Sequence, residues 1–385
     1  MSDLLLSIVV PTKNRYEYLK AFIDLYSTFD KDKTELVIQD NSDTKTDIEQ
    51  YTKNFPEKNI IYNYVPKAMP VIENSELAIL NSRGKYVCFM GDDDLLSKYV
   101  VDIVEKMDRS NIDSIVFKKA IYSWPGMQYK AHNFPSLNIP NFTGEIRHID
   151  SKREYEKLLQ RGATELDKIP QLYHGIVKRS VLNAIKDTTG SFFPGPSPDM
   201  AVATCLSRFV SHHVYIDAPF VSSGKSPKSA AGLGAKHEHK GELKAISFLP
   251  SDIEEKWDKR LPFVWTGPTI YAQSALEAMK SMGLKNDQQR FDFSYFYAYF
   301  DTFCSDYKKQ SQEAKKNVSL NHIRYWFSRV GIFSNRIKVY IKNKMLLSLH
   351  WGGKLVENVP NCIEAERIID EEIEKVLNIE MIDLR

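Results

Sequence analysis

The stretch YVCFMGDDDLLSKYV, residues 86–100, joins an apolar segment to three consecutive aspartates. Residues 86–90 are apolar or aromatic on both faces of an extended chain, which is typical of a strand buried within a parallel sheet. Gly91 separates this strand from the acidic triplet 92–94. Because adjacent carboxylates repel each other, such a loop needs either a neighbouring cation or full exposure to solvent.

Strand-like and helix-like segments alternate on both sides of this stretch. Apolar, β-rich runs at 4–10, 36–38, 60–65, 86–90 and 114–122 predict strands, and helical spacing predicts helices at 15–28, 44–54, 71–82 and 96–107. The connections are short, which favours a doubly wound, mostly parallel α/β sheet flanked by helices. Residues 174–185 then predict a strand that turns into a helix.

Three polar loops follow the predicted strands. They read PTKNR (11–15), QDNSD (39–43) and GDDD (91–94). Ligands of doubly wound sheets bind beyond the carboxyl ends of the strands. We therefore expect these loops to open onto one edge of the sheet.

The acidic triplet offers ligands for a metal ion. In an extended segment, Asp92 and Asp94 point the same way and Asp93 points away. Hard oxygen ligands suit Mg²⁺ or Mn²⁺, which bridge to diphosphate oxygens. A solvated turn without a ligand is the alternative.

Four segments, in this order, carry a family resemblance: SIVVPTKNR (7–15), LVIQDNSD (36–43), NSELAILNSRGKYVCFMGDDDLLS (74–97) and PSPDM (196–200). Together the segments resemble family 2 glycosyltransferases of the GT-A fold, of the bacterial surface-glycan type, over roughly residues 4–230. The resemblance implies an inverting, metal-dependent transfer of a sugar from a nucleotide-sugar, most often a UDP-sugar, to a hydroxyl of a glycan or lipid-linked glycan.

The resemblance also assigns roles to residues. It places Pro11, Thr12 and Asn14 beside the nucleotide, with Arg15 nearby. It implies that Asp40 contacts the base, although Asn41 stands where the family more often has Gly. It makes Asp94 the direct metal ligand for Mn²⁺ or Mg²⁺. The resemblance puts Asp92 near the metal, the ribose and the diphosphate, and it counts Asp92 and Asp93 among the nucleotide-binding residues.

The resemblance implies that Asp199 is the catalytic base. An acceptor hydroxyl needs a carboxylate to take its proton as it attacks. The family has a Glu before this aspartate, and this sequence has Pro198. Asp199 also precedes an apolar-periodic helix, so a role as helix N-cap is the alternative, and both roles are compatible.

Four further residues are weaker candidates. Arg83 and Lys225 have the charge to neutralise phosphate, but exposed strand-edge or loop positions explain them as well. Residues 222–232 predict a mobile loop that closes over the donor. His237 and His239 form an HxH that is either a further metal ligand or solvated.

Composition limits the partners and the cellular compartment that we expect for this protein. The chain has 385 residues and a net charge of +2, which gives no reason to expect a nucleic-acid partner. Four cysteines without paired spacing indicate a reducing compartment. No secretory signal or membrane-spanning run is evident, which predicts a cytoplasmic protein, with the inner face of the cell membrane as an open possibility.

The chain changes character near residue 240. Residues 1–240 predict the catalytic domain, and 241–385 predict a mainly helical region for acceptor, homo-oligomer or membrane-surface contact. Residues 308–344 are basic and aromatic, so helix packing or an oligomer contact and an anionic membrane surface are both open. A nucleotidyltransferase and a non-catalytic sugar-nucleotide-binding or scaffold protein are the alternative functions. The first normally has a glycine-rich loop, which residues 11–18 lack.

Overall fold

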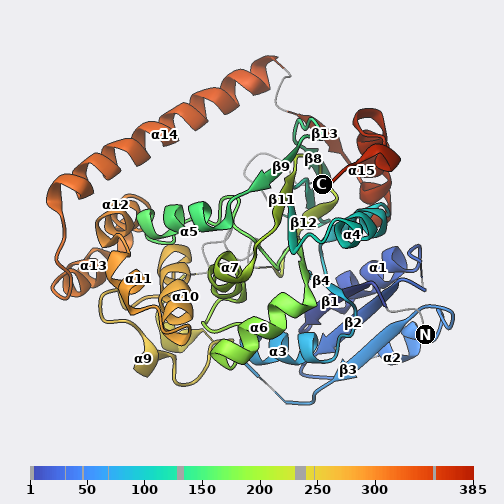
Figure 1. Ribbon diagram of the computed structural model, residues 1–385, viewed down its shortest axis with the longest axis horizontal. Helices are drawn as coiled ribbons and strands as arrows, with labels where there is room; N and C mark the ends of the chain where they lie inside the picture. Colours follow the sequence, from blue (N-terminus) through green and yellow to red (C-terminus); the bar gives the residue numbers. More distant parts are fainter. Residues whose placement is uncertain are drawn as a thin grey trace.

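The computed structural model describes residues 4–385 except 31, 46, 68, 128–133, 230–239, 247 and 350–352, and only the backbone of 342–349. Figure 1 shows a central sheet with helices on both faces, a helical part at one side, and one long helix that runs along the outside.

The central sheet is of mixed direction. In spatial order its strands are β3 (Ile60–Tyr64), β2 (Thr34–Asp40), β1 (Leu6–Thr12), β4 (Tyr86–Phe89), β10 (Gly175–Lys178), β6 (Ser114–Phe117), β11 (His213–Ile216) and β9 (Ile146–Ile149). The first four are mutually parallel, and β10 runs antiparallel to both of its neighbours. The parallel half carries the three polar loops at its carboxyl edge.

Helices cover both faces of this sheet because its central strands are apolar on both faces. The helices are α1 (Tyr16–Tyr26), α2 (Ile48–Thr52), α3 (Val71–Leu80), α4 (Val100–Arg109), α5 (Ser151–Gln160), α6 (Arg179–Thr189) and α7 (Pro198–Phe209). Ile8 and Val10 of β1 pack into the core shared with α1 and α4. Val9 points to the other face, into the core shared with α3, α6 and α7. The predicted α/β fold class is confirmed.

A second, smaller sheet lies beside the first. Its order is β13 (Lys354–Glu357), β8 (Ser136–Ile139), β7 (Ile121–Ser123), β12 (Val221–Lys225) and β5 (Leu95–Leu96). The single strand predicted at 114–122 is wrong, because the chain leaves the first sheet after Phe117 and joins the second at Ile121. The loop predicted from 222 is also wrong as far as Lys225, since these residues pair with β5 and β7.

The region beyond residue 240 is mainly helical, as predicted. It contains η1 (Leu243–Ala245), α9 (Ile253–Lys256), α10 (Gly267–Ser281), α11 (Lys285–Arg290), α12 (Phe293–Phe303), η2 (Ser305–Tyr307), α13 (Lys308–Lys315), α14 (His322–Leu349), α15 (Cys362–Val376) and η3 (Ile379–Met381). In the part of the chain that the structure describes, no helix is both long enough and apolar enough to cross a bilayer.

The last residues return to the first core. Cys362 and Ile369 of α15 belong to the core that contains Phe22 of α1. Ser97 Oγ donates to Asp370 Oδ1 at 2.5 Å, which ties α15 to the segment after the acidic triplet. The predicted division at residue 240 does not anticipate this return.

Candidate active site

The ends of β1 and β2 lie side by side. Their register pairs Pro11 with Gln39 and Thr12 with Asp40. The backbone N–H of Asn41 donates to the carbonyl of Thr12 at 3.2 Å. Two of the predicted nucleotide-binding segments therefore form one continuous edge.

Hydrogen bonds join the three polar loops. Thr12 Oγ1 donates to Asp92 Oδ2 at 2.5 Å. The backbone N–H of Asn14 donates to Ser42 Oγ at 2.7 Å, and the Asn14 side chain exchanges two hydrogen bonds with Asp43. Asn14 has φ 58°, a left-handed conformation that Asn tolerates better than most residues. The expected convergence of the loops is present.

A guanidinium group pairs with the first two aspartates of the triplet. Arg15 Nη2 lies 3.0 Å from Asp92 Oδ1 and 2.7 Å from Asp93 Oδ2. The backbone N–H of Ser226, just after β12, donates to Asp93 Oδ2 at 3.1 Å. Burial raises the pKa of Asp92 to about 7, although the charge of Arg15 opposes that rise. Arg15 is thus the neighbouring cation that the sequence analysis gave as one way to offset the repulsion between adjacent carboxylates.

Asp94 is bonded into the protein rather than toward the loop edge. Its Oδ2 accepts from the N–H of Gly91 at 2.7 Å and from Tyr173 OH at 3.0 Å, and lies 2.6 Å from His174 Nε2. Its Oδ1 accepts from the N–H of Gly224 at 2.8 Å. Burial favours a higher pKa for Asp94, but His174 and the two backbone N–H groups outweigh it and lower that pKa.

The expected alternation within the triplet is wrong. Asp92 and Asp93 approach the same nitrogen of Arg15, and Asp94 has separate partners. The reason is local geometry, because the N–H of Asp94 donates back to the carbonyl of Gly91 at 3.3 Å and closes a turn. Side chains alternate only along an extended segment.

The residues do not fit the predicted Mn²⁺ or Mg²⁺ site as they are arranged. Asp94 is 1% exposed and already has four partners, three at Oδ2 and one at Oδ1. Asp92 Oδ1 has no hydrogen-bond donor, but Arg15 lies against it. Among the described residues, no three His, Cys, Asp or Glu side chains form a metal-ligating group. A cation would reach Asp92 and Asp93 only after Arg15 left them.

Asp40 is fully buried at the end of β2. Its Oδ2 accepts from Tyr16 OH and Tyr62 OH, both at 2.8 Å, and its Oδ1 accepts from the N–H of Ser42 at 2.8 Å. Asp40 therefore holds the second loop in shape. No carboxylate atom of Asp40 is exposed in this structure, so none is available for the predicted contact with a nucleobase.

Asp199 lies in the first turn of α7, where Ser197 is the N-cap residue. The alternative role of Asp199 as N-cap is therefore wrong. Its carboxylate has no hydrogen bond or ion pair within the described ranges, and the amino end of a helix favours negative charge. Burial raises the pKa of Asp199, while the charges of His174 and Lys119 lower it and that of Asp94 raises it. A carboxylate that keeps free acceptor atoms and a raised pKa suits a general base.

Three neighbours of this site were missed by sequence reasoning. Lys119 lies between β6 and β7, and Tyr173 and His174 precede β10. His174 is 4% exposed and has φ 59°, a conformation that is uncommon for a non-glycine residue and marks a held position. No spacing in the sequence signals these residues, because each reaches the site through the crossing of separate strands.

The close packing of β12 against the triplet is also apparent only from the tertiary structure. A Cβ on Gly224 would lie 1.6 Å from the carbonyl oxygen of Asp93, so only glycine fits there. Trp124 Nε1 donates to the same carbonyl oxygen at 2.7 Å. The second sheet therefore packs directly against the acidic loop.

The weaker candidate residues differ in their position relative to the acidic triplet. Arg83 lies at the opposite, amino edge of the sheet, with Nε 3.5 Å from the buried Glu35, so it does not join the cluster. Lys225 ends β12 next to the triplet, and burial lowers its pKa. His237 and His239 lie outside the described residues.

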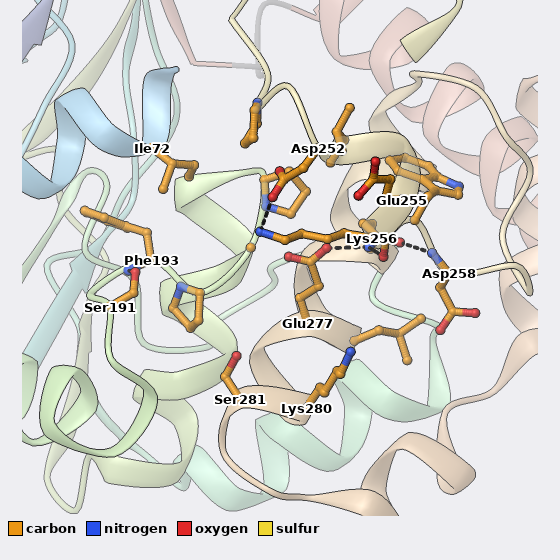
Figure 2. A pocket seen from close by; sticks show the side chains of 18 of the residues that line it. Ile72, Ser191, Phe193, Asp252, Glu255, Lys256, Asp258, Glu277, Lys280 and Ser281 are labelled. Atoms are coloured by element: carbon orange, nitrogen blue, oxygen red, sulfur yellow. Dashed lines mark hydrogen bonds and ion pairs between the residues drawn. The ribbon is translucent and has the colours of Figure 1, made fainter. Parts of the chain in front are cut away.

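A separate pocket of about 880 Å³ adjoins the segment that leads to Asp199. Gly195 and Pro196 form one side of it, and α9 and α10 form another. Figure 2 shows Lys256 reaching toward Asp252, to which its ammonium is 2.6 Å away. No residue of the acidic triplet lines this pocket, so the pocket is distinct from the acidic loop in position.

Comparisons with known proteins give one family match. Residues 7–169 match the model of Glycosyl transferase family 2. No curated protein sequence matches the chain. The family match includes the three polar loops and the triplet, and it ends before Asp199.

Solved structures resemble the chain at low identity. S. aureus TarS 1–349 in complex with UDP-GlcNAc has 12% identity and a TM-score of 0.48, and the alignment covers 86% of this chain and 92% of that chain. The mannosyltransferase PcManGT from Pyrobaculum calidifontis, in complex with GDP-Man and Mn²⁺, has 13% identity and a TM-score of 0.39, covering 86% and 88%. In the longer S. aureus TarS structure, at 15% identity and a TM-score of 0.44, the alignment covers 58% of this chain and 37% of that one.

Proposed function

We propose, from the match of residues 7–169 to Glycosyl transferase family 2, that the protein transfers a sugar from a nucleotide-sugar, a UDP-sugar, to a hydroxyl of a glycan or lipid-linked glycan. We place the reaction in bacterial surface-polysaccharide synthesis. The observation that carries the proposal is the junction of three loops at one sheet edge, with the carboxylate of Asp199, which has no partner among the described residues, near Asp94 and His174.

The proposed transfer inverts the anomeric centre. Asp199 takes the proton of the acceptor hydroxyl as its oxygen attacks the anomeric carbon. The bond from that carbon to the diphosphate oxygen breaks on the opposite face, and the nucleoside diphosphate leaves with the electron pair. Arg15 has the charge and the planar donors that a diphosphate needs. The arrangement of Asp92–Asp94 gives no support to a step through a metal ion.

Arg15 is expected to compete with divalent cations for Asp92 and Asp93. In Arg15→Ala, Mn²⁺ should bind the nucleotide-free protein about tenfold more tightly or better. Two unit charges about 4 Å apart interact by about 4 kcal/mol at an effective dielectric of 20, and tenfold needs only about 1.4 kcal/mol. Calorimetry or Mn²⁺ electron paramagnetic resonance measures this affinity.

Lys13→Ala is the matched control, because Lys13 lies in the same loop but pairs with the exposed Asp43 at 3.7 Å. Its Mn²⁺ affinity should equal that of the unmodified protein. If the Mn²⁺ affinity of Arg15→Ala also equals that of the unmodified protein, Arg15 does not compete with the cation for Asp92 and Asp93. Activity that vanishes in EDTA would restore the metal dependence that the sequence predicts.

The pH dependence of turnover should report Asp199. A base works when ionised, so the rate falls as pH drops through its pKa, and burial raises that pKa above the ordinary value of about 3.9. Lys119→Met removes a positive charge that lowers the pKa of Asp199. The acidic limb of kcat against pH should therefore move to higher pH.

Lys118→Met is the control for charge removal at the adjacent position. Lys118 pairs with Asp217 at 3.0 Å, and it does not act on Asp199. Its acidic limb should stay in place. If the acidic limb moves equally in both variants, or in neither, the ionisation behind it is not that of Asp199.

A panel of nucleotide-sugars tests the proposal directly. Thermal-shift measurements with UDP-, GDP-, CMP- and ADP-sugars identify the donor, because a bound ligand raises apparent stability by mass action. Slow hydrolysis of the stabilising donor, followed as released nucleotide, then tests catalysis without knowledge of the acceptor. Stabilisation by no nucleotide-sugar would refute the proposal.

A further inference from the structure

Helix α14 carries an exposed apolar stripe, which we define as Ile323, Trp326, Phe327, Val330, Phe333, Ile337, Tyr340 and Ile341. Successive members are one, three or four residues apart, so they share one face of the helix. Phe327 is 74% exposed and Ile323 is 72% exposed. Figure 1 shows α14 along the outside of the molecule, leading away from α12 and α13.

The opposite face of α14 fixes this orientation. Tyr325 and Ser328 are buried, and Ile332 packs against the same helical core. Tyr325 OH donates to Asp301 Oδ2 of α12 at 2.7 Å. These contacts lie half a turn from the stripe, so burying the stripe by rolling the helix would break them.

The charge of the helix is of one sign. Residues 322–349 contain six Lys or Arg residues and no Asp or Glu. Arg336 and Lys338 have no ion pair among the described residues, and their positions flank the stripe on opposite sides. Arg329 stacks on Trp326, with its guanidinium carbon 5.6 Å from the ring centroid. An apolar stripe between basic flanks is complementary to an anionic lipid surface.

A second copy of α14 is a poorer occupant. Two such stripes in contact would bring their basic flanks together without an acidic residue on either helix to compensate. Over the residues that the structure describes, no helix, α14 included, is long and apolar enough to cross a bilayer. We propose that α14 lies in the plane of an anionic membrane surface, with the stripe inserted at the boundary between headgroups and acyl chains. This inference does not depend on the proposed transfer.

Vesicle flotation of the full chain tests this inference. The protein should float with vesicles of phosphatidylcholine containing about one third phosphatidylglycerol, should float less with pure phosphatidylcholine, and should be released by high salt. Phe327→Glu/Phe333→Glu should reduce binding to anionic vesicles by about tenfold or more, because it places charge in the stripe. Arg336→Gln/Lys338→Gln should reduce binding to the anionic vesicles alone.

Met381→Glu is the matched control, because Met381 is 79% exposed and lies outside α14. Thermal unfolding of each variant checks that the fold is unchanged, as exposed positions predict. Two results would overturn the inference. One is equal flotation of the stripe and control variants, and the other is an unmodified protein that ignores anionic vesicles. Light scattering that shows a dimer dissociated by Phe327→Glu/Phe333→Glu, without vesicle binding, would assign the stripe to a second copy.

Discussion

Asp199→Asn should lower kcat by about 10²–10⁴-fold, the range that a general base contributes, and should leave the affinity for the donor nucleotide nearly unchanged. The amide keeps the size of the carboxylate but does not take a proton. Asp199 has no hydrogen bond or ion pair to lose among the described residues, so the fold should persist. Donor hydrolysis and calorimetry with UDP, on the same preparation, measure the two quantities.

Asp217→Asn is a suitable comparison, because Asp217 is an aspartate with a different task. It pairs with Lys118 at 3.0 Å and accepts two hydrogen bonds from Thr143, both at 2.9 Å. Its substitution should affect stability rather than kcat. Loss of UDP binding in Asp199→Asn would contradict the base assignment, and unchanged kcat would favour a protein that binds a nucleotide-sugar without catalysis.

Asp94→Ala should destabilise the fold by about 3–5 kcal/mol, the loss expected when one partner of a buried charged network is removed. The substitution leaves His174 Nε2, Tyr173 OH and two backbone N–H groups without their acceptor. Urea denaturation measures this free energy of unfolding. The effect should exceed that of any exposed carboxylate in the neighbouring loop.

Two comparisons sharpen that result. Asp43→Ala alters an exposed carboxylate of the second loop, and its free energy of unfolding should change little. Because the fold lowers the pKa of Asp94, its ionised form stabilises the protein above the unfolded pKa, and this contribution is lost as pH falls through the folded pKa. Asp94→Ala should therefore remove that part of the acid sensitivity. A stable Asp94→Ala protein that has lost Mn²⁺ binding would instead support the sequence-based role as metal ligand.

Periodicity predicted the first half of the fold because each strand there stays in one sheet. Apolar residues on both faces of β1 and β4 correctly indicated buried parallel strands. The same reasoning failed at 114–122 and at 222–225. An extended segment looks alike in either sheet, and the Ser- and Gly-rich β12 is extended because β5 and β7 pair with it.

The sequence by itself determined that three polar loops would meet at one edge of a parallel sheet, because strand direction places all their carboxyl ends together. It also indicated that the triplet needed either a neighbouring cation or full exposure to solvent. Only the tertiary structure decided that the cation is Arg15 and that Asp94 turns inward to His174. A turn at Gly91, and partners up to 130 residues away, set those directions, and neither follows from spacing along the chain.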